Sequence, residues 1–270
     1  MTATVASAVP AQLSVVSYAH RGASAHAPEN TLAAFALAAH LGANAVELDI
    51  RRTLDGHLVI SHDATLARTT DVARVYPERV DHPVESFTLA ELRRLDAGGW
   101  HSPAYAGERV PTLAEAMDLL AGHGLGLLLE AKEPARYPGM AGQIAHALRT
   151  VQPRWLRMAA AGRLTVESFD WDFVRELRAV LPRVAVGLLG APDVDALAGL
   201  AGFADQINPA HATLTAEYVE AVHQYGMAVN TWTVDDPAEM VRVLGAGVDG
   251  VISNCPDRLA SVVQTTAAVA

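Results

Sequence analysis

Ionisable side chains stand at the ends of apolar, strand-like runs near the start of the chain. The run VVSYAH ends at His20, which Arg21 follows, and the run NAVELDI carries Glu47 and Asp49 two positions apart. Because an unpaired buried charge is costly, side chains in such places pair with one another, hold a metal ion or line a polar site. These residues are therefore the first candidates for a site that carries out chemistry.

The alternation of side chains along a strand predicts where these carboxylates point. If Val46, Leu48 and Ile50 face outward, Glu47 and Asp49 both face inward. Two carboxylates at neighbouring inward positions repel each other. A bound cation, a basic partner or a raised pKa relieves that repulsion.

A later run, LGLLLEAKEP, repeats the arrangement, with Glu130 and Lys132 on one face. The sequence thus offers three inward acids beside one lysine. It contains a single cysteine, Cys255, which we interpret as a core residue rather than a metal ligand. Oxygen ligands in this number favour one divalent cation, Mg²⁺ or Ca²⁺, over zinc.

Basic and titratable groups accompany the acids. His62 follows the second strand, so that the set holds two histidines, which titrate near neutrality, beside Arg21 and Lys132, which attract an anion. Cleavage of a phosphodiester, with proton transfer by the histidines, uses all of these groups. The alternative interpretation is that these residues form a buried salt-bridge network. Three acids at strand ends favour a catalytic site over such a network.

Other charged residues are interpreted as structural. We expect Arg51 and Arg52 to face solvent or pair with loops rather than with phosphate. The remaining nine histidines are expected at the surface or at caps: His26, His40, His57, His82, His101, His123, His146, His211 and His223.

Short β-rich runs alternate with amphipathic stretches, which is typical of βα units around a parallel sheet. The predicted strands are Val15 to His20, Ala45 to Ile50, Leu125 to Lys132, Thr165 to Phe169, Val184 to Leu189, Asp205 to Asn208, Met227 to Val234 and Gly247 to Ser253. The first predicted helix is capped by Thr31, carries an apolar stripe of Leu32, Phe35, Ala36 and Ala39, and ends at Gly42. Further helices are predicted at about Leu113 to Ala121, Met140 to Val151, Trp171 to Val180, Val194 to Leu200, Ala216 to Gln224, Pro237 to Leu244 and Pro256 to Val263. Eight units in this length predict a (β/α)₈ TIM barrel, an α/β fold.

One interval departs from the alternation. Asp55-Gly56 between strand-like runs predicts a hairpin, and we expect an insertion from about residue 64 to residue 110 to follow it. A doubly wound sheet is disfavoured because HRGASAHAPENT lacks the spacing of a glycine-rich phosphate turn.

Composition restricts the partners and the setting. The chain has 270 residues, is 51% hydrophobic and carries a formal charge of −10, without a basic stripe that would bind nucleic acid. Residues 1–14 lack the features of a signal peptide and are expected to be a disordered tail before a single domain, 15–270. Without a long apolar run, we expect no stable membrane association and a cytoplasmic location.

Several segments resemble the signature segments of glycerophosphodiester phosphodiesterases. They are AHRGASAHAPENTLAAF, VELDIRRTLDGHLVISHD and LEAKEP, followed by LDAGGWHSPAYAGERVPTLAEAM, ESFD, NTWTVDD and GVDGVISNCPD in the family's order, over about residues 16 to 258. The resemblance implies a (β/α)₈ barrel with a small insertion after the second strand. It also implies hydrolysis of glycerophosphodiesters to sn-glycerol 3-phosphate and an alcohol.

The resemblance also implies roles for individual residues. His20 and His62 correspond to the family's acid/base pair, Arg21 and Lys132 to its phosphate contacts, and Glu47, Asp49 and Glu130 to its divalent metal ligands. Trp232 and Phe169 match the family's aromatic positions, where they pack either on the glycerol carbons or in the core. Glu29 and Asn30 of PENT are expected to fix the first loop, and Glu133 adds an acid beside the site.

Two other functions are compatible with these residues. One is a phospholipase-type enzyme acting on lysophospholipids, and the other is a non-catalytic barrel that binds a phosphorylated metabolite. The sequence leaves open the head group, the native metal and which histidine is the acid. It also leaves open whether water attacks directly or a glycerol hydroxyl first forms a cyclic phosphate, and it is compatible with a homo-oligomer.

Overall fold

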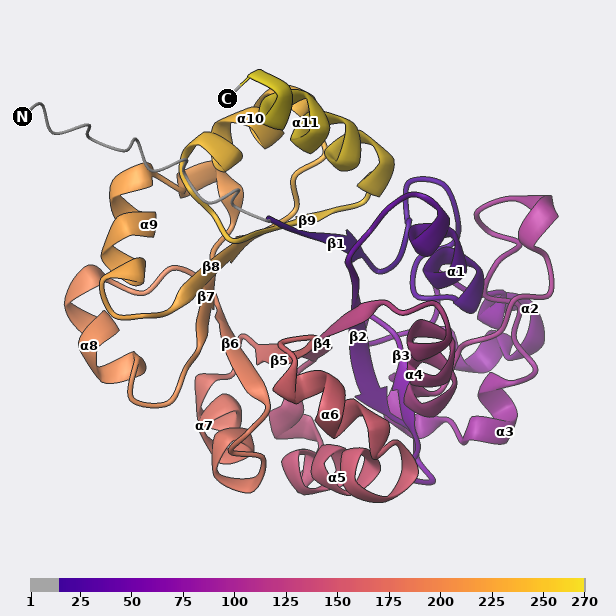
Figure 1. Cartoon of the computed structure of the whole chain (residues 1–270). Helices are drawn as coiled ribbons and strands as arrows, with labels where there is room; N and C mark the ends of the chain where they lie inside the picture. The colour runs from indigo at the N-terminus through magenta and orange to yellow at the C-terminus, as the bar shows by residue number, and fades with distance from the viewer. Residues whose placement is uncertain (1–14, 270) are drawn as a thin grey trace, which may run out of the picture.

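Parallel strands form a closed barrel surrounded by helices in the computed structural model, which describes residues 15–269 (Figure 1). The tail expected at residues 1–14 lies outside the described residues. The strands are β1 (Val16–His20), β2 (Ala45–Arg52), β3 (Leu58–Ile60), β4 (Gly126–Ala131), β5 (Leu164–Ser168), β6 (Ala185–Leu189), β7 (Gln206–Asn208), β8 (Ala228–Thr231) and β9 (Gly250–Ser253).

The order of the strands closes the ring. Among residues 15–269 the sheet runs β1-β9-β8-β7-β6-β5-β4-β2-β3, and a parallel pairing of β1 with β2 completes the barrel. β3 pairs antiparallel with β2, outside the ring. The predicted (β/α)₈ barrel is therefore confirmed, and each predicted strand run overlaps a barrel strand.

Helices cover the outside of the barrel. They are α1 (Leu32–His40), α4 (Leu113–Gly122), α5 (Met140–His146), α6 (Arg154–Ala160), α7 (Trp171–Val180), α8 (Leu197–Leu200), α9 (Ala216–His223), α10 (Pro237–Gly245) and α11 (Pro256–Val269), while α2 (Val72–Val75) and α3 (Leu89–Leu92) lie in the segment after β3. The π-helix η5 (Ala147–Val151) continues α5, and short 3₁₀ helices are η1 (Pro77–Arg79), η2 (Val84–Ser86), η3 (Pro103–Tyr105), η4 (Pro134–Arg136), η6 (Val194–Ala196) and η7 (His211–Thr213).

Several details of the helices differ from the prediction. α2 and α3, within the expected insertion, were not predicted. α6 was not predicted, because Pro153 suggests a break, whereas a proline is also well suited to the start of a helix. In α1, Thr31 caps the helix as expected, and Phe35 of the predicted stripe is buried while Leu32 and Ala39 pack half-buried against the core. Ala34 and Ala38, which were not in the predicted stripe, are buried as well. An alanine-rich helix specifies its buried face weakly, since alanines on every side pack equally well.

The predicted alternation on the strands is confirmed. Val46, Leu48 and Ile50 of β2 belong to the main apolar core between the barrel and the helices, as do Leu127, Leu129 and Ala131 of β4. The intervening acids therefore face the interior of the barrel.

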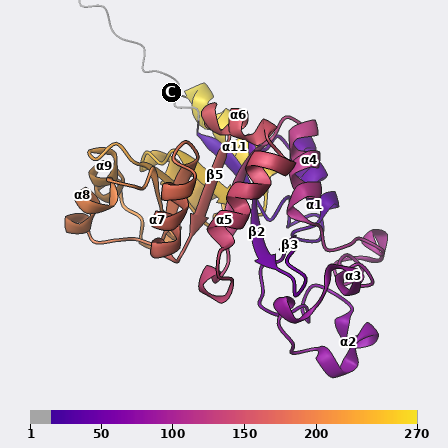
Figure 2. The same cartoon turned by 90° about the horizontal axis from the view of Figure 1, so that it is seen from below.

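The segment between the barrel and α4 starts with the predicted hairpin. β2 and β3 pair antiparallel across a turn in which Gly56 has a φ of +86°. Figures 1 and 2 both show α2 and α3 at the outer edge of the molecule, on the side of the barrel that carries β2 and β3. This segment has its own small apolar cluster, made of Val59, Leu66, Val72, Tyr76, Val84, Phe87, Leu92, Leu95, Ala97 and Val110.

The loop after β1 depends on a glycine. Gly22 has a φ of +83°, and a Cβ atom there would lie 2.7 Å from both the carbonyl carbon and the Cβ of Ala34 at the start of α1. Both the backbone conformation and the available space therefore require glycine at this position. Gly22 thereby lets the loop that carries Arg21 pack directly on α1.

We expect Gly22→Ala to lower the free energy of unfolding by roughly 2–3 kcal/mol, since strain and overlap add. Gly56→Ala is the matched control, because Gly56 has a similar φ but no neighbour within 4 Å of the added Cβ. It should cost only about 1 kcal/mol. Urea denaturation of both variants checks this, and equal losses would contradict the close packing at Gly22.

Candidate active site

Register brings the inward acids together. Parallel pairing sets His20 of β1 opposite Glu47 of β2, then Asp49 opposite Glu130 of β4, and Glu130 opposite Glu167 of β5. Neighbouring strands lie about 4.8 Å apart, so residues at matched levels on one face become neighbours. The four carboxylates therefore gather at the carboxyl end of the barrel strands, where (β/α)₈ barrels carry their active sites.

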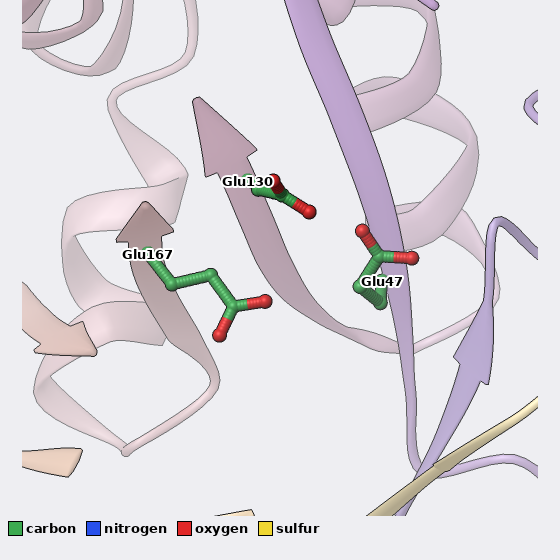
Figure 3. A group of neighbouring side chains, drawn as sticks. All are labelled: Glu47, Glu130 and Glu167. Atoms are coloured by element: carbon green, nitrogen blue, oxygen red, sulfur yellow. The ribbon is translucent and has the colours of Figure 1, made fainter. Parts of the chain in front are cut away.

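Three of the acids form the tightest group. Glu47, Glu130 and Glu167 each offer a carboxylate oxygen within 4.8 Å of the others, and Figure 3 shows them pointing toward one another. All three are buried, with exposed fractions of 2%, 8% and 1%. Glu167 was not singled out from the sequence, although it lies two positions beyond Thr165 on the inward face of β5.

The crowding of these acids changes their pKa values. Burial, and then the charges of Asp49 and Glu130, raise the pKa of Glu47 well above its ordinary value. Burial and Asp49 raise the pKa of Glu130 to about 7. Burial and the charge of Glu130 raise that of Glu167 to about 8. Without a compensating positive charge, the cluster therefore retains protons near neutral pH.

Asp49 is the acid that has both cationic side chains beside it. Asn30 Nδ2 donates to its Oδ2 at 2.8 Å, and the cations of Arg21 and Lys132 lie 3.4 and 3.5 Å from its oxygens. Burial acts to raise the pKa of Asp49, but Lys132 and Arg21 outweigh it and lower that pKa. The structure thus places Asp49 beside the cluster but paired with the two cations.

Both predicted cations reach the acids. Lys132 Nζ donates to Glu130 Oε1 at 2.7 Å. The backbone N–H of Arg21 donates to Glu47 Oε2 at 2.9 Å, and its guanidinium donates to Glu29 Oε1 at 2.8 Å. Both cationic residues therefore contact carboxylates of the site directly.

His20 is held by an amide. Its Nδ1 lies 2.7 Å from Asn254 Oδ1, which is the acceptor because Nδ2 of the same amide donates to Asp235. His20 Nε2 lies 3.9 Å from Glu47 Oε2. Burial and the charge of Arg21 lower the pKa of His20 to about 4. Asn254 and Asp235 lie in the quoted segments GVDGVISNCPD and NTWTVDD, but neither was singled out.

His62 is held in place by hydrogen bonds to its ring and to its backbone carbonyl. Its Nδ1 lies 2.7 Å from Asp63 Oδ1. Arg51 donates to the His62 carbonyl from Nε and Nη2, at 3.1 and 2.8 Å, and also to Glu133 at 2.7 Å. Burial lowers the pKa of His62, while the charge of Asp49 and the hydrogen bond with Asp63 act in the opposite direction. Arg51 thus pairs with a loop, as expected, and Glu133 turns toward it.

One cavity receives most of the predicted residues. It is lined by His20, Arg21, Glu47, His62, Glu130, Lys132, Glu167, Phe169, Leu189, Trp232, Thr233 and Ile252. Among the predicted site residues, which all lie in the described chain, Asp49 does not line it, being covered by Arg21 and Lys132. The nine other histidines, also all within the described residues, do not line it either.

The aromatic residues form one apolar side of this cavity. The rings of Phe169 and Trp232 meet edge to face with centroids 5.8 Å apart. Trp232 Nε1 donates to the carbonyl of Asn208 at 2.8 Å, which fixes the indole, whereas Phe169 is 55% exposed. An anion held by the cations would therefore have an apolar surface within reach.

The fold and the cavity define a (β/α)₈ barrel whose strand ends bring together acids, two histidines and two cations. The sequence model of the glycerophosphoryl diester phosphodiesterase family matches residues 20–258. The chain belongs to this family, and it is an enzyme of the glycerophosphodiester phosphodiesterase class.

Individual relatives agree with this assignment. A glycerophosphodiester phosphodiesterase of Caldanaerobacter subterraneus subsp. tengcongensis is 35% identical over 250 residues, 91% of this chain and 96% of the relative. One of Bacillus subtilis is 31% identical over 90% of this chain and 84% of its own length. A phosphodiesterase from Oleispira antarctica, solved with the product sn-glycerol-3-phosphate, has a TM-score of 0.81 and 29% identity, with 92% of this chain and 96% of that one covered. Within residues 15–269, no helix is long and apolar enough to cross a bilayer.

The pKa of Glu167 predicts a pH dependence of stability. Because it rises from 4.5 to about 8, the folded protein holds a proton that the unfolded chain loses, so stability falls as the pH rises through this window. In EDTA, the free energy of unfolding of Glu167→Gln should increase relative to wild type by at least about 1 kcal/mol between about pH 5 and pH 8.

Urea denaturation across this pH range measures the difference between the two proteins. Glu220→Gln, at an exposed position on α9, is the control and should differ from wild type by a constant amount. A constant difference for Glu167→Gln as well would contradict the raised pKa.

Proposed function

We propose that this enzyme hydrolyses glycerophosphodiesters to sn-glycerol 3-phosphate and an alcohol, with one divalent cation and with His20 and His62 as its acid/base pair. The observation that carries the proposal is the shared cavity: both histidines, Arg21 and Lys132 line it together with the buried acids. The Oleispira antarctica neighbour, which binds sn-glycerol-3-phosphate, supports the same substrate class.

The acids suit a hard divalent cation. Among the described residues, Glu47 Oε1 and Asp49 Oδ1 are buried without a hydrogen-bond partner, and all the oxygens of the group belong to carboxylates. Mg²⁺ and Ca²⁺ prefer such ligands. We assign the ion to Glu47, Asp49 and Glu130, with Glu167 as a further oxygen donor. When bound, it supplies positive charge that polarises the phosphate and stabilises the charge developing on it.

Arg21 and Lys132 bind the phosphate in this proposal. Each now contacts a carboxylate, and each can donate to a phosphate oxygen as well, because guanidinium and ammonium groups carry several N–H donors. Their charges stabilise the phosphate as negative charge accumulates during displacement.

The partners of the two histidines suggest different roles. Nδ1 of each ring is occupied, by Asn254 for His20 and by Asp63 for His62, so Nε2 of each is the nitrogen free for proton transfer. A carboxylate stabilises a protonated imidazole more than a neutral amide does. We therefore assign His62 as the acid that protonates the leaving alkoxide, and His20 as the base that accepts the proton of the attacking hydroxyl.

The remaining features concern selectivity and setting. We infer that Trp232 and Phe169 pack on the glycerol carbons, while the alcohol beyond the phosphate points outward, so that choline, ethanolamine, glycerol or inositol head groups are all accepted. We also infer that the segment from about residue 64 to residue 110 is an insertion within a single domain, 15–270. A cytoplasmic location stays a prediction from the sequence.

The test is release of sn-glycerol 3-phosphate from glycerophosphocholine by the purified protein. We expect EDTA to abolish the activity, Mg²⁺ or Ca²⁺ to restore it, and His20→Ala and His62→Ala each to lower kcat at least about 100-fold. Phosphorus NMR of the reaction detects a cyclic glycerophosphate if the glycerol hydroxyl attacks first. Hydrolysis of a long-chain lysophospholipid alone would contradict the proposal in favour of a phospholipase.

Calorimetric titration with Ca²⁺ tests the assignment of the cation separately from activity. We expect Glu47→Gln to weaken binding at least roughly tenfold, because it removes an oxygen that has no hydrogen-bond partner in the folded chain. Glu220→Gln should leave the affinity unchanged. Unaltered binding by Glu47→Gln would place the cation elsewhere.

A further inference from the structure

Arg68 joins two parts of the site without lining the cavity. It belongs to the segment that follows β3, and its side chain is 46% exposed. Toward one side, Nη1 and Nη2 donate to Glu29 at 2.6 and 2.8 Å. Toward the other, Nε and Nη2 donate to Asp63 at 2.7 and 3.2 Å. One planar guanidinium thus binds two carboxylates on different loops.

Each of these carboxylates also holds a residue of the proposed machinery. Glu29 Oε1 accepts from Arg21 Nη1 at 2.8 Å, and it also accepts from Arg68 Nη2. Asp63 Oδ1 lies 2.7 Å from His62 Nδ1, and it too accepts from Arg68 Nη2. The contacts form a continuous chain from Arg21 to His62, with Arg68 at its centre.

We propose that Arg68 is a positioning residue, which holds Glu29 and Asp63 in one fork and so keeps Arg21 and His62 in a fixed relative position. The proposal rests on the roles assigned above to these two residues. An arginine suits the task because its planar donors engage two carboxylates at once, which a lysine ammonium does not do with the same geometry.

The charge state of Asp63 agrees with this arrangement. Partial burial acts to raise its pKa, but hydrogen bonds from Arg68 and His62 outweigh burial and lower that pKa to about 2. Asp63 is therefore ionised across the working range of most enzymes. As an acceptor only, it keeps one proton of the His62 ring on Nδ1, so that Nε2 is the nitrogen that gains the second proton and passes it to the leaving alkoxide.

Steady-state kinetics on a glycerophosphodiester substrate distinguish the contact of Arg68 with Asp63, which supports His62, from its contact with Glu29, which supports Arg21. Asp63→Asn should lower kcat roughly 10- to 100-fold with little change in KM, because it releases the proton-transferring ring. Glu29→Gln should mainly raise KM, because it releases the phosphate-binding Arg21. Arg68→Gln should do both, by roughly tenfold each, and Arg68→Lys should recover only part of the loss.

Arg74→Gln is the matched control, since Arg74 also pairs with an acid, Asp71, in the same segment but is 76% exposed and lies outside the chain of contacts. It should leave kcat and KM unchanged. Full recovery by Arg68→Lys, or kinetics of Arg68→Gln equal to those of Arg74→Gln, would overturn the proposal.

Nitrogen-15 NMR of His62 provides a readout that needs no turnover. We expect the ring to hold its neutral proton on Nδ1 in wild type and in Arg74→Gln, and to show a mixture of tautomers in Arg68→Gln. An unchanged tautomer in Arg68→Gln would overturn the inference even if the enzyme is active. An inactive wild type whose tautomer still depends on Arg68 would instead contradict only the proposed function.

Discussion

The structure depends on one electrostatic constraint, which is the burial of four carboxylates at the carboxyl ends of neighbouring parallel strands. Glu47, Asp49, Glu130 and Glu167 come from β2, β4 and β5, whose register sets them at adjacent levels. Isolated, such a group would repel itself and retain protons, as the raised pKa values of Glu130 and Glu167 indicate. Positive charge must therefore be supplied at this place, and Arg21 and Lys132 supply part of it.

The same constraint explains why the histidines are supported from outside the cluster. Each uses Nδ1 for a fixed partner, Asn254 or Asp63, and keeps the other nitrogen for the cavity. The supports reach the loops after β1, β3 and β9, so that residues distant in the chain orient one site. The barrel strands place the acids, and the hydrogen-bonded loops at the end of the barrel orient the two histidine rings.

Much of this could be predicted from the sequence, for identifiable reasons. Alternation on β2 and β4 placed Glu47 and Glu130 inward, and a strong contrast between apolar and charged residues made the pattern readable. α6 was not predicted, and Ala34 and Ala38 were missed on the buried face of α1, because a proline and a run of alanines carry ambiguous signals. The support of His20 by Asn254 spans 234 positions, and only the closure of the barrel brings them together.

A crystal structure of the protein grown with Ca²⁺ and glycerol 3-phosphate tests the central claim most directly. The account predicts a cation about 2.4 Å from oxygens of Glu47, Asp49 and Glu130, with the phosphate within hydrogen-bond distance of Arg21 and Lys132. An acidic cluster that binds no cation under these conditions, with its carboxylates neutralised only by protons, Arg21 and Lys132, would contradict it.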